Sequence, residues 1–274
     1  MKLLTFILKL SRPRFWLYLA GPYLLGYTFA YEHSQTFITP LFLYSFFFFL
    51  IPANIFLYGV NDVNDMETDI MNPKKKSKEQ TTHQQNLKTY QWCILISLLC
   101  AFPLFLLQNS TTNFFTVFFL ALSYYYSAPP LRFKKRPFID SISNILYAIP
   151  AFIGFMQIQS HFPNFYDVIT IWLWTTAMHL YSAIPDIEYD KKAGIQTTAV
   201  YMGKKNSLWL CFILWFCMAV LGIFISPFFI LAFVYPLGIL LVITNIISPM
   251  KMYWLFPYIT TLLGFLLYLY AYTT

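Results

Sequence analysis

Four acidic residues follow one of the most apolar runs of the chain, at a spacing that could bind a metal ion. The run covers residues 40–60, and the stretch NDVNDMETD comes directly after it. If the helix continues, Asn61, Asp65 and Asp69 form one stripe at i, i+4 and i+8, with Asp62 beside it. Carboxylates next to hydrocarbon are costly, so they usually mark a functional site.

A second acidic cluster, in the stretch PDIEYD, repeats this spacing at Asp186 and Asp190. Like charges at i and i+4 repel each other, and a bound cation would neutralise them. Oxygen ligands that can reach a substrate favour Mg²⁺, which is commonly shared between carboxylates and phosphates. No His or Cys accompanies either cluster, which argues against zinc. The alternative is that both clusters are solvated helix ends, but the repeated spacing disfavours it.

A basic and aromatic stretch between the two clusters could bind an anion. Four basic residues are packed into positions 132–136, and Lys191 directly follows the second cluster. Arg matches phosphate oxygens by bidentate geometry and Lys acts as a point charge, so one or two of these residues could bind a diphosphate. The alternative for the loop is a plain topology signal. Tyrosines 124–126 are typical of a membrane-interface belt, but an aromatic face can also stabilise a cation.

The composition indicates a membrane protein. The chain has 274 residues, of which 58% are hydrophobic and only 11% charged, whereas a soluble domain has about 25% charged residues. A bilayer-spanning helix needs roughly 20 mostly apolar residues. We therefore expect an all-α membrane protein with a single polytopic domain over residues 1–274. Residues 1–14 are interpreted as a short interfacial segment and not as a cleaved signal.

Charge placement predicts nine transmembrane helices and their orientation. All 18 Lys and Arg residues lie in segments on the side that carries the N-terminus. The positive-inside rule places that side in the cytoplasm, so the net charge of +7 is a topology signal and gives no case for nucleic acid. The predicted spans are residues 15–31, 40–60, 89–107, 113–128, 141–159, 165–185, 207–225, 227–247 and 253–271.

The positions of the acidic clusters suggest an internal repeat. They end the second and the sixth predicted spans, which are four spans apart and so run in the same direction. The clusters can therefore face each other at the cytoplasmic side. This arrangement predicts two parallel four-helix halves around a central cavity, plus a ninth helix.

Three motifs of this chain form a recognisable set: NxxxDxxxD at Asn61, Asp65 and Asp69, the stretch YSAPPLRFK, and DxxxDxxxG at Asp186, Asp190 and Gly194. Together they resemble the UbiA superfamily of intramembrane prenyltransferases, and the resemblance covers nearly the whole chain. Two further stretches, residues 11–26 and 182–203, together with LRFKKRPFIDSISN, resemble the lycopene elongase branch, which attaches five-carbon units to a carotenoid.

The resemblance implies a Mg²⁺-dependent transfer of a prenyl group from an allylic diphosphate to an apolar acceptor from the bilayer. Two Mg²⁺ ions held by the two motifs would neutralise the leaving diphosphate, and the allylic carbon would become cationic. A cavity walled by helices and aromatic side chains would exclude water. A site on the cytoplasmic face of the cell membrane suits a substrate with a charged head and a hydrocarbon tail.

The resemblance also implies roles for individual residues. Asp140 would help to shape the site, without an assigned role, and His179 is expected to be a buried, hydrogen-bonded histidine outside it. No residue is assigned to remove the final proton. The implied metal ligands are Asp65, Asp69, Asp186 and Asp190; the diphosphate contacts are Asn61, Asp62, Arg132, Lys134 and Lys191; and the catalytic residues are Lys134 and Tyr126.

Two other functions remain as alternatives. The same chemistry could prenylate a quinone precursor or another lipid acceptor. An ion-coupled transporter belongs to another class of protein, and it predicts acids near the middle of the bilayer. The acids of this chain lie at the predicted cytoplasmic ends of the helices, which counts against a transporter.

Overall fold

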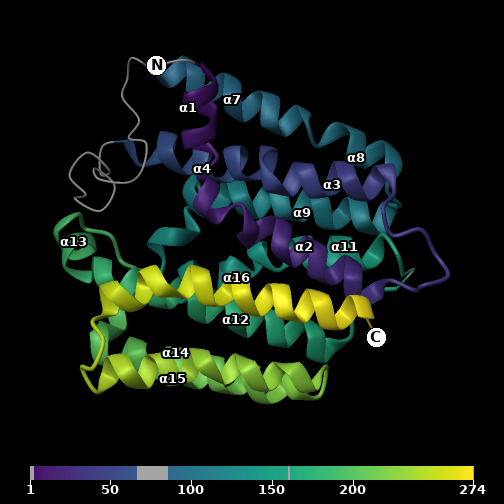
Figure 1. The fold of residues 1–274 in the computed structure, drawn as a ribbon. Coiled ribbons are helices and arrows are strands. Elements are labelled where there is room, and N and C mark those ends of the chain that lie inside the picture. The colour runs from purple at the N-terminus through teal and green to yellow at the C-terminus, as the bar shows by residue number, and fades with distance from the viewer. Residues whose placement is uncertain (1–2, 67–85, 160, 274) are drawn as a thin grey trace. The chain divides into compact units, whose positions relative to one another are not determined.

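The computed structural model describes residues 3–66, 86–159 and 161–273, and within these ranges all regular structure is helical, without any strand (Figure 1). The expectation of an all-α protein is thus confirmed for this part of the chain. The chain forms two compact units, which are treated one at a time. They consist of Met1–Arg132 with Ile149–His161, and of Phe133–Ala148 with Phe162–Thr274.

The first unit contains the first acidic motif, and four of its helices, α3, α4, α8 and α9, begin near a proline or at a polar cap. Pro40 and Pro52 begin two of them, where a missing N–H has no helical partner to lose. Figure 1 shows α3 and α4 end to end, alongside α7 and α8. The elements are α1 (Leu3–Leu10), η1 (Pro13–Phe15), α2 (Leu17–Ala30), α3 (Pro40–Leu50), α4 (Pro52–Asn64), α7 (Leu87–Leu99), α8 (Phe102–Leu107), α9 (Ser110–Ser127) and α11 (Ile149–Met156).

Two glycines allow α2 and α11 to approach closely. A Cβ atom at Gly26 would lie 1.9 Å from the carbonyl oxygen of Ala151, and one at Gly154 would lie 2.3 Å from that of Tyr23. Only glycine fits at such backbone contacts. The sequence assigned the fifth predicted span, which includes α11, to the second four-helix half. In the structure α11 packs against α2 and belongs to the first unit. Counting spans could not reveal this packing.

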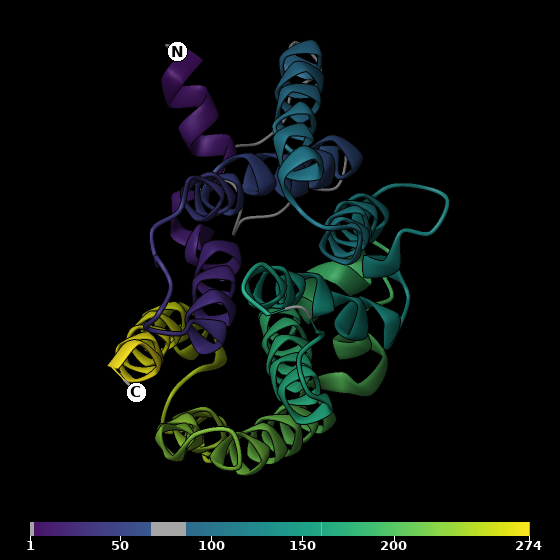
Figure 2. The same cartoon turned by 90° about the vertical axis from the view of Figure 1, so that its right-hand side faces the viewer.

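The second unit contains the basic loop from residue 133 onward and the second acidic motif. Helix α14 packs along α12 and α15, and Figure 2 shows the green helices of this region from a second direction. The elements are η3 (Phe133–Lys135), α10 (Ile139–Ile142), η4 (Ser143–Tyr147), α12 (Phe165–Ala183), η5 (Ile184–Asp186), α13 (Ile187–Lys192), α14 (Thr198–Ile223), η6 (Pro227–Phe233), α15 (Val234–Ile243) and α16 (Pro249–Thr273).

An aromatic cluster forms the core of the second unit. Trp215 is fully buried and lies 5.1 Å from the ring of Tyr235 and 4.9 Å from that of Phe256. The ring of Tyr181 packs edge-on against Phe256 at 4.9 Å, and its hydroxyl donates to the carbonyl oxygen of Pro249. Such pairs contribute about 0.5–1.5 kcal/mol each beyond area burial. The cluster therefore ties α12, which leads into the second acidic motif, to α14, α15 and α16.

Long apolar helices with exposed apolar surface characterise an integral membrane protein. Five helical stretches are long and apolar enough to cross a bilayer, within the described residues: Pro40–Asn64, Leu87–Leu107, Ile139–Met156, Thr198–Ile223 and Pro249–Thr273. Only 11% of the most apolar window of the last stretch is buried, which suits contact with lipid. Nine spans and a cytoplasmic N-terminus remain predictions.

The seventh predicted span differs from the structure at its beginning. The sequence places its first residue at 207, whereas α14 begins at Thr198. A kink at Gly203, with φ of 75°, separates the first turn from the apolar part of the helix. The residues just after this kink are polar or basic, so a prediction based on apolar content did not include the beginning of the helix.

Candidate functional site

The first motif lies at the carboxyl end of α4. This helix ends earlier than the sequence predicted, because the predicted stripe of acids required a helix as far as residue 69. The helix ends at Asn64, and Asp65 follows as its C-cap with a backbone N–H that donates to the carbonyl oxygen of Asn61 at 3.0 Å. Asp65 therefore keeps its place one turn after Asn61. Residues 67–85 lie outside the described residues, so the predicted metal ligand Asp69 is not placed.

Polar contacts join the ends of α4 and α9 at the first motif. The side-chain amide of Asn61 donates to the hydroxyl of Ser127 at 3.0 Å. The Arg132 guanidinium donates to the carbonyl oxygen of Asn64 at 2.8 Å and to that of Ser127 at 3.2 Å. A basic side chain commonly satisfies the last carbonyls of a helix in this way. Arg132, predicted as a diphosphate contact, thus also holds the motif in place.

Asp62 is paired with an arginine that the sequence did not single out. The Arg12 guanidinium donates to Asp62 Oδ1 at 2.6 Å, and both side chains are largely buried. The same guanidinium lies 4.5 Å from the centroid of the Tyr58 ring. A buried carboxylate requires such a partner. The one feature of the sequence that could have indicated this pairing is that Arg12 lies on the same predicted side of the membrane as Asp62.

The second motif spans a break between helices. Helix α12 ends at Ala183, just before Pro185, and Asp186 then precedes the short helix α13 that contains Asp190. Pro185 accounts for the break because it cannot donate a helical hydrogen bond. Both aspartates are half-buried.

Gly194, the last residue of the second motif, ends α13. Its φ is 69°, a left-handed conformation that glycine adopts without strain. Its N–H donates to the carbonyl oxygen of Lys191 at 3.2 Å, and the N–H of Ile195 donates to that of Asp190 at 2.8 Å. This pair of bonds is a standard glycine C-cap. The glycine of the motif therefore serves to stop the helix directly after the second aspartate.

The predicted cationic residues of the second unit differ in exposure. Lys134 is half-buried in η3, whereas Lys191 is exposed and lies 3.8 Å from Glu188 of the same turn. An exposed pair of this kind contributes little to stability, so Lys191 can exchange this partner for a ligand at little cost. In the first unit Tyr126 is half-buried near the end of α9, and Tyr124 is exposed.

Each unit thus contains one part of the predicted site. The first contains Asn61, Asp62, Asp65, Tyr126 and Arg132. The second contains Lys134, Asp186, Asp190 and Lys191. Within the part of the chain that the structure describes, no group of three or more His, Cys, Asp or Glu side chains could hold a metal ion by itself. The acids of both motifs supply only oxygen ligands, which suits Mg²⁺.

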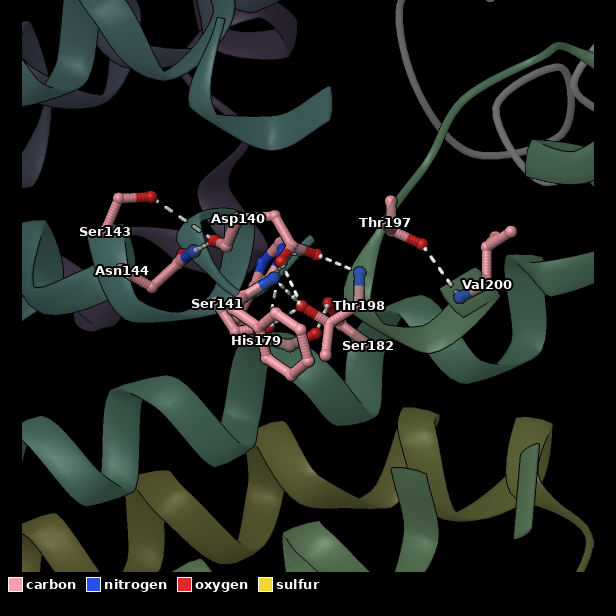
Figure 3. Close-up of polar contacts among 10 residues, drawn as sticks. Asp140, Ser141, Ser143, Asn144, His179, Ser182, Thr197, Thr198 and Val200 are labelled. Atoms are coloured by element: carbon pink, nitrogen blue, oxygen red, sulfur yellow. Dashed lines mark hydrogen bonds and ion pairs between the residues drawn. The ribbon is translucent and has the colours of Figure 1, made fainter. Parts of the chain in front are cut away.

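His179 and Asp140 lie together in the second unit, next to the second motif. The His179 Nε2 atom is 3.7 Å from Asp140 Oδ2, and Asp140 is fully buried (Figure 3). The sequence predicted a partnered histidine but not this carboxylate as its partner. Nor did it single out Thr198, which donates to the same carboxylate. The two residues are 39 positions apart in the sequence, so no local pattern indicates that they pair.

Comparisons with known proteins agree with one another. A model of the UbiA prenyltransferase family matches residues 19–260. A lycopene elongase/hydratase of Haloarcula japonica is 41% identical over 96% of this chain and 89% of its own length. One from Corynebacterium glutamicum is 34% identical over 81% of this chain and 77% of its own.

Solved structures share the fold. A UbiA homolog from Archaeoglobus fulgidus, bound to GPP and Mg²⁺, superposes with a TM-score of 0.76 at 21% identity, covering 98% of this chain and 99% of its own. The helical fold, the apolar helices and the family match over most of the chain lead to one conclusion. This integral membrane protein belongs to the UbiA prenyltransferase family and is a prenyltransferase.

Proposed function

We propose that the chain transfers a five-carbon prenyl group from an allylic diphosphate to an apolar acceptor of the carotenoid type, such as lycopene, with Mg²⁺ as the metal. The observation that carries this proposal is the 41% identity, over 96% of the chain, to a protein named lycopene elongase/hydratase. A second relative of that name, at 34% identity, supports the same acceptor class.

The acidic motifs would hold the diphosphate through metal. Asp65 and Asp69 of the first motif and Asp186 and Asp190 of the second are the proposed ligands. Bound Mg²⁺ would neutralise charge on the diphosphate and so make it a better leaving group. A carboxylate that binds Mg²⁺ together with a phosphate usually leaves several waters on the ion, so half-buried aspartates suit this task better than fully buried ones.

Basic and amide side chains would bind the diphosphate oxygens directly. Lys134 in η3 and Lys191 in α13 can each place an ammonium group near the second motif, and Arg132 and Asn61 lie at the first. These charges oppose the negative charge that develops on the leaving group as the C1–O bond breaks. Asp62 keeps Arg12 as its partner, so its proposed role is to order the end of α4 around Asn61 and Asp65.

The transfer needs a cationic allylic carbon to meet a double bond of the acceptor without water. The acceptor double bond attacks C1 of the donor, diphosphate leaves, and the new tertiary cation loses a proton to a base or takes up water and then loses a proton. Tyr126, half-buried at the end of α9, is the proposed aromatic group beside the allylic carbon, where its ring can stabilise positive charge. Apolar helices around the site would exclude water until the bond has formed.

The assay uses membranes that contain the full chain, radiolabelled dimethylallyl diphosphate, Mg²⁺ and either lycopene or a hydroxybenzoate acceptor. We expect label in a carotenoid longer than lycopene by one or two five-carbon units. EDTA should abolish the transfer and added Mg²⁺ should restore it. Label in the aromatic acceptor alone would replace the carotenoid by a quinone precursor, and activity that is indifferent to EDTA would contradict the metal assignment.

The proposed orientation places the acidic motifs and the basic loop on the cytoplasmic face. All of these segments belong to the side that contains every Lys and Arg. A diphosphate donor is charged and water-soluble at its head, so it would enter from that face, whereas the acceptor would enter sideways from the bilayer. The ion-coupled transporter considered from the sequence does not fit a prenyltransferase family member.

A further inference from the structure

A buried carboxylate beside the basic loop has no part in the chemistry proposed above. Asp140 lies in α10, four residues after Arg136, with an exposed fraction of 0%. Both of its carboxylate oxygens accept hydrogen bonds from Thr198, Oδ2 from the backbone N–H at 2.9 Å and Oδ1 from the hydroxyl (Figure 3). A buried carboxylate is costly unless donors compensate it, so Asp140 depends on Thr198 and conversely fixes where Thr198 can lie.

Thr198 connects this carboxylate to the end of the basic loop. Its hydroxyl oxygen accepts a hydrogen bond from the backbone N–H of Phe138 at 2.6 Å. Phe138 has φ of 67°, a left-handed conformation that residues other than glycine rarely adopt. Such a conformation persists only where the surroundings enforce it. The Thr198 hydroxyl is thus one of the contacts that hold the last residue of the loop in its unusual conformation.

The same contacts fix the segment that follows the second motif. Thr198 is the first residue of α14 and comes four residues after Gly194. The carboxylate of Asp140 accepts the backbone N–H of Thr198, at the start of the short helical turn that precedes the kink at Gly203. Asp140 therefore anchors the chain where it leaves the second motif.

His179 links Asp140 to α12, the helix that leads into the second motif. It lies on α12, seven residues before Asp186, and its Nε2 is 3.7 Å from Asp140 Oδ2. Asn144 donates to the backbone carbonyl of Asp140 at 2.5 Å and fixes α10 itself. Asp140 thus contacts the segments on both sides of the second motif and the end of the basic loop, all within one unit of the fold.

We propose that Asp140 and Thr198 are positioning residues that hold Lys134 at a fixed place relative to Asp186 and Asp190, so that ammonium and metal ligands act on the same diphosphate. Lys134 lies in η3, which packs against α10. The proposal rests on the proposed function, because the ligand is the diphosphate of the prenyl donor. A displacement of about 1 Å in such a constellation can lower the rate by up to about 100-fold.

The test compares Asp140→Asn and Thr198→Val with wild type as purified full chains in nanodiscs. The readouts are KM for dimethylallyl diphosphate, kcat, and binding of its unreactive thiolodiphosphate analogue with Mg²⁺ by calorimetry. We expect KM and the analogue Kd to rise about tenfold, because a displaced Lys134 no longer meets the diphosphate in the geometry that binding requires. Thr198→Ser retains the hydroxyl and should bind as wild type does.

The matched control is Thr175→Val. Thr175 is as buried as Thr198 and lies in the same unit, but its hydroxyl donates to the carbonyl oxygen of Trp172 in its own helix. A merely structural role for Thr198 would lower the yield of folded protein, as loss of any buried hydroxyl can, and leave KM unchanged in the folded fraction. We therefore expect Thr175→Val to keep the wild-type KM and analogue Kd.

The outcomes separate this proposal from the proposed function. Unchanged analogue binding in Thr198→Val, or an equal loss in Thr175→Val, would overturn the positioning role. Thr198→Val decides alone if Asp140→Asn does not fold. If Asp186→Asn abolishes analogue binding but neither positioning variant weakens it, only the present inference fails. If wild type itself does not bind the analogue with Mg²⁺, the proposed function is wrong, and this inference, which depends on it, is wrong as well.

Discussion

At the scale of single residues, the aspartates fall into two groups: fully buried ones that have protein partners, and half-buried ones that are proposed to bind metal. Asp62 and Asp140 are fully buried; Asp62 pairs with Arg12 through Oδ1, and Asp140 accepts hydrogen bonds from Thr198. Asp65 and Asp186 are half-buried at helix ends. A fully buried, compensated carboxylate organises its surroundings, whereas a half-buried one retains access to water and metal. Burial therefore distinguishes two roles that residue type alone does not.

The proposed metal ligands predict a sharp contrast within one turn. Replacing Asp186 by Asn should lower kcat/KM by about 100-fold, since an amide cannot neutralise a divalent ion and one charge-stabilising group is lost. Glu188→Gln provides the control, because Glu188 is exposed and pairs only loosely with Lys191. Steady-state kinetics across a Mg²⁺ titration make the comparison. Equal losses in both variants would refute a specific ligand role for Asp186.

The Arg12–Asp62 pair predicts a large effect on stability. Arg12→Met removes the positive charge beside a buried carboxylate, which should lower the free energy of unfolding by about 3–5 kcal/mol. The double variant Arg12→Met/Asp62→Leu removes both charges and should recover most of this loss. Thermal unfolding in detergent, followed by intrinsic fluorescence, measures both. A double variant no more stable than Arg12→Met would show that the arginine acts through packing against Tyr58 instead.

At the scale of elements, periodicity and charge predicted most helices but not their ends or partners. The run of residues 40–60 was one span in the sequence and is α3 and α4 in the structure, because Pro52 begins a new helix. The predicted stripe through Asp69 required the helix to continue beyond residue 64, whereas α4 ends at Asn64. The Asp140–His179–Thr198 contacts join segments far apart in sequence, and no single-chain pattern encodes such a contact. Local signals thus located the motifs, and tertiary contacts decided how each is held.

The close approach of α2 and α11 predicts an unusually sensitive glycine. Gly154→Ala places a methyl group against the backbone of Tyr23, so something must shift. Overpacking of this kind costs about 1–3 kcal/mol, and we expect a fall of several degrees in Tm. Gly264→Ala is the control, because a Cβ there meets nothing within 4 Å and alanine favours the helix. A similar Tm in both variants would contradict the role given to this packing.

At the scale of the whole molecule, every positive charge belongs to one predicted side of the membrane, and that distribution predicts orientation. Gln35 lies in the segment between α2 and α3, whereas Lys192 ends α13. The positive-inside rule places the first outside the cell and the second in the cytoplasm. In a cysteine-free background, an impermeant maleimide should label Gln35→Cys but not Lys192→Cys in intact cells, and both after the membrane is opened. The reverse pattern would move the acidic motifs and the donor site to the outer face, where a cytoplasmic diphosphate could not reach them. Labelling of both in intact cells would mean that Gln35 and Lys192 share a side, and the predicted number of spans between them would be wrong by one.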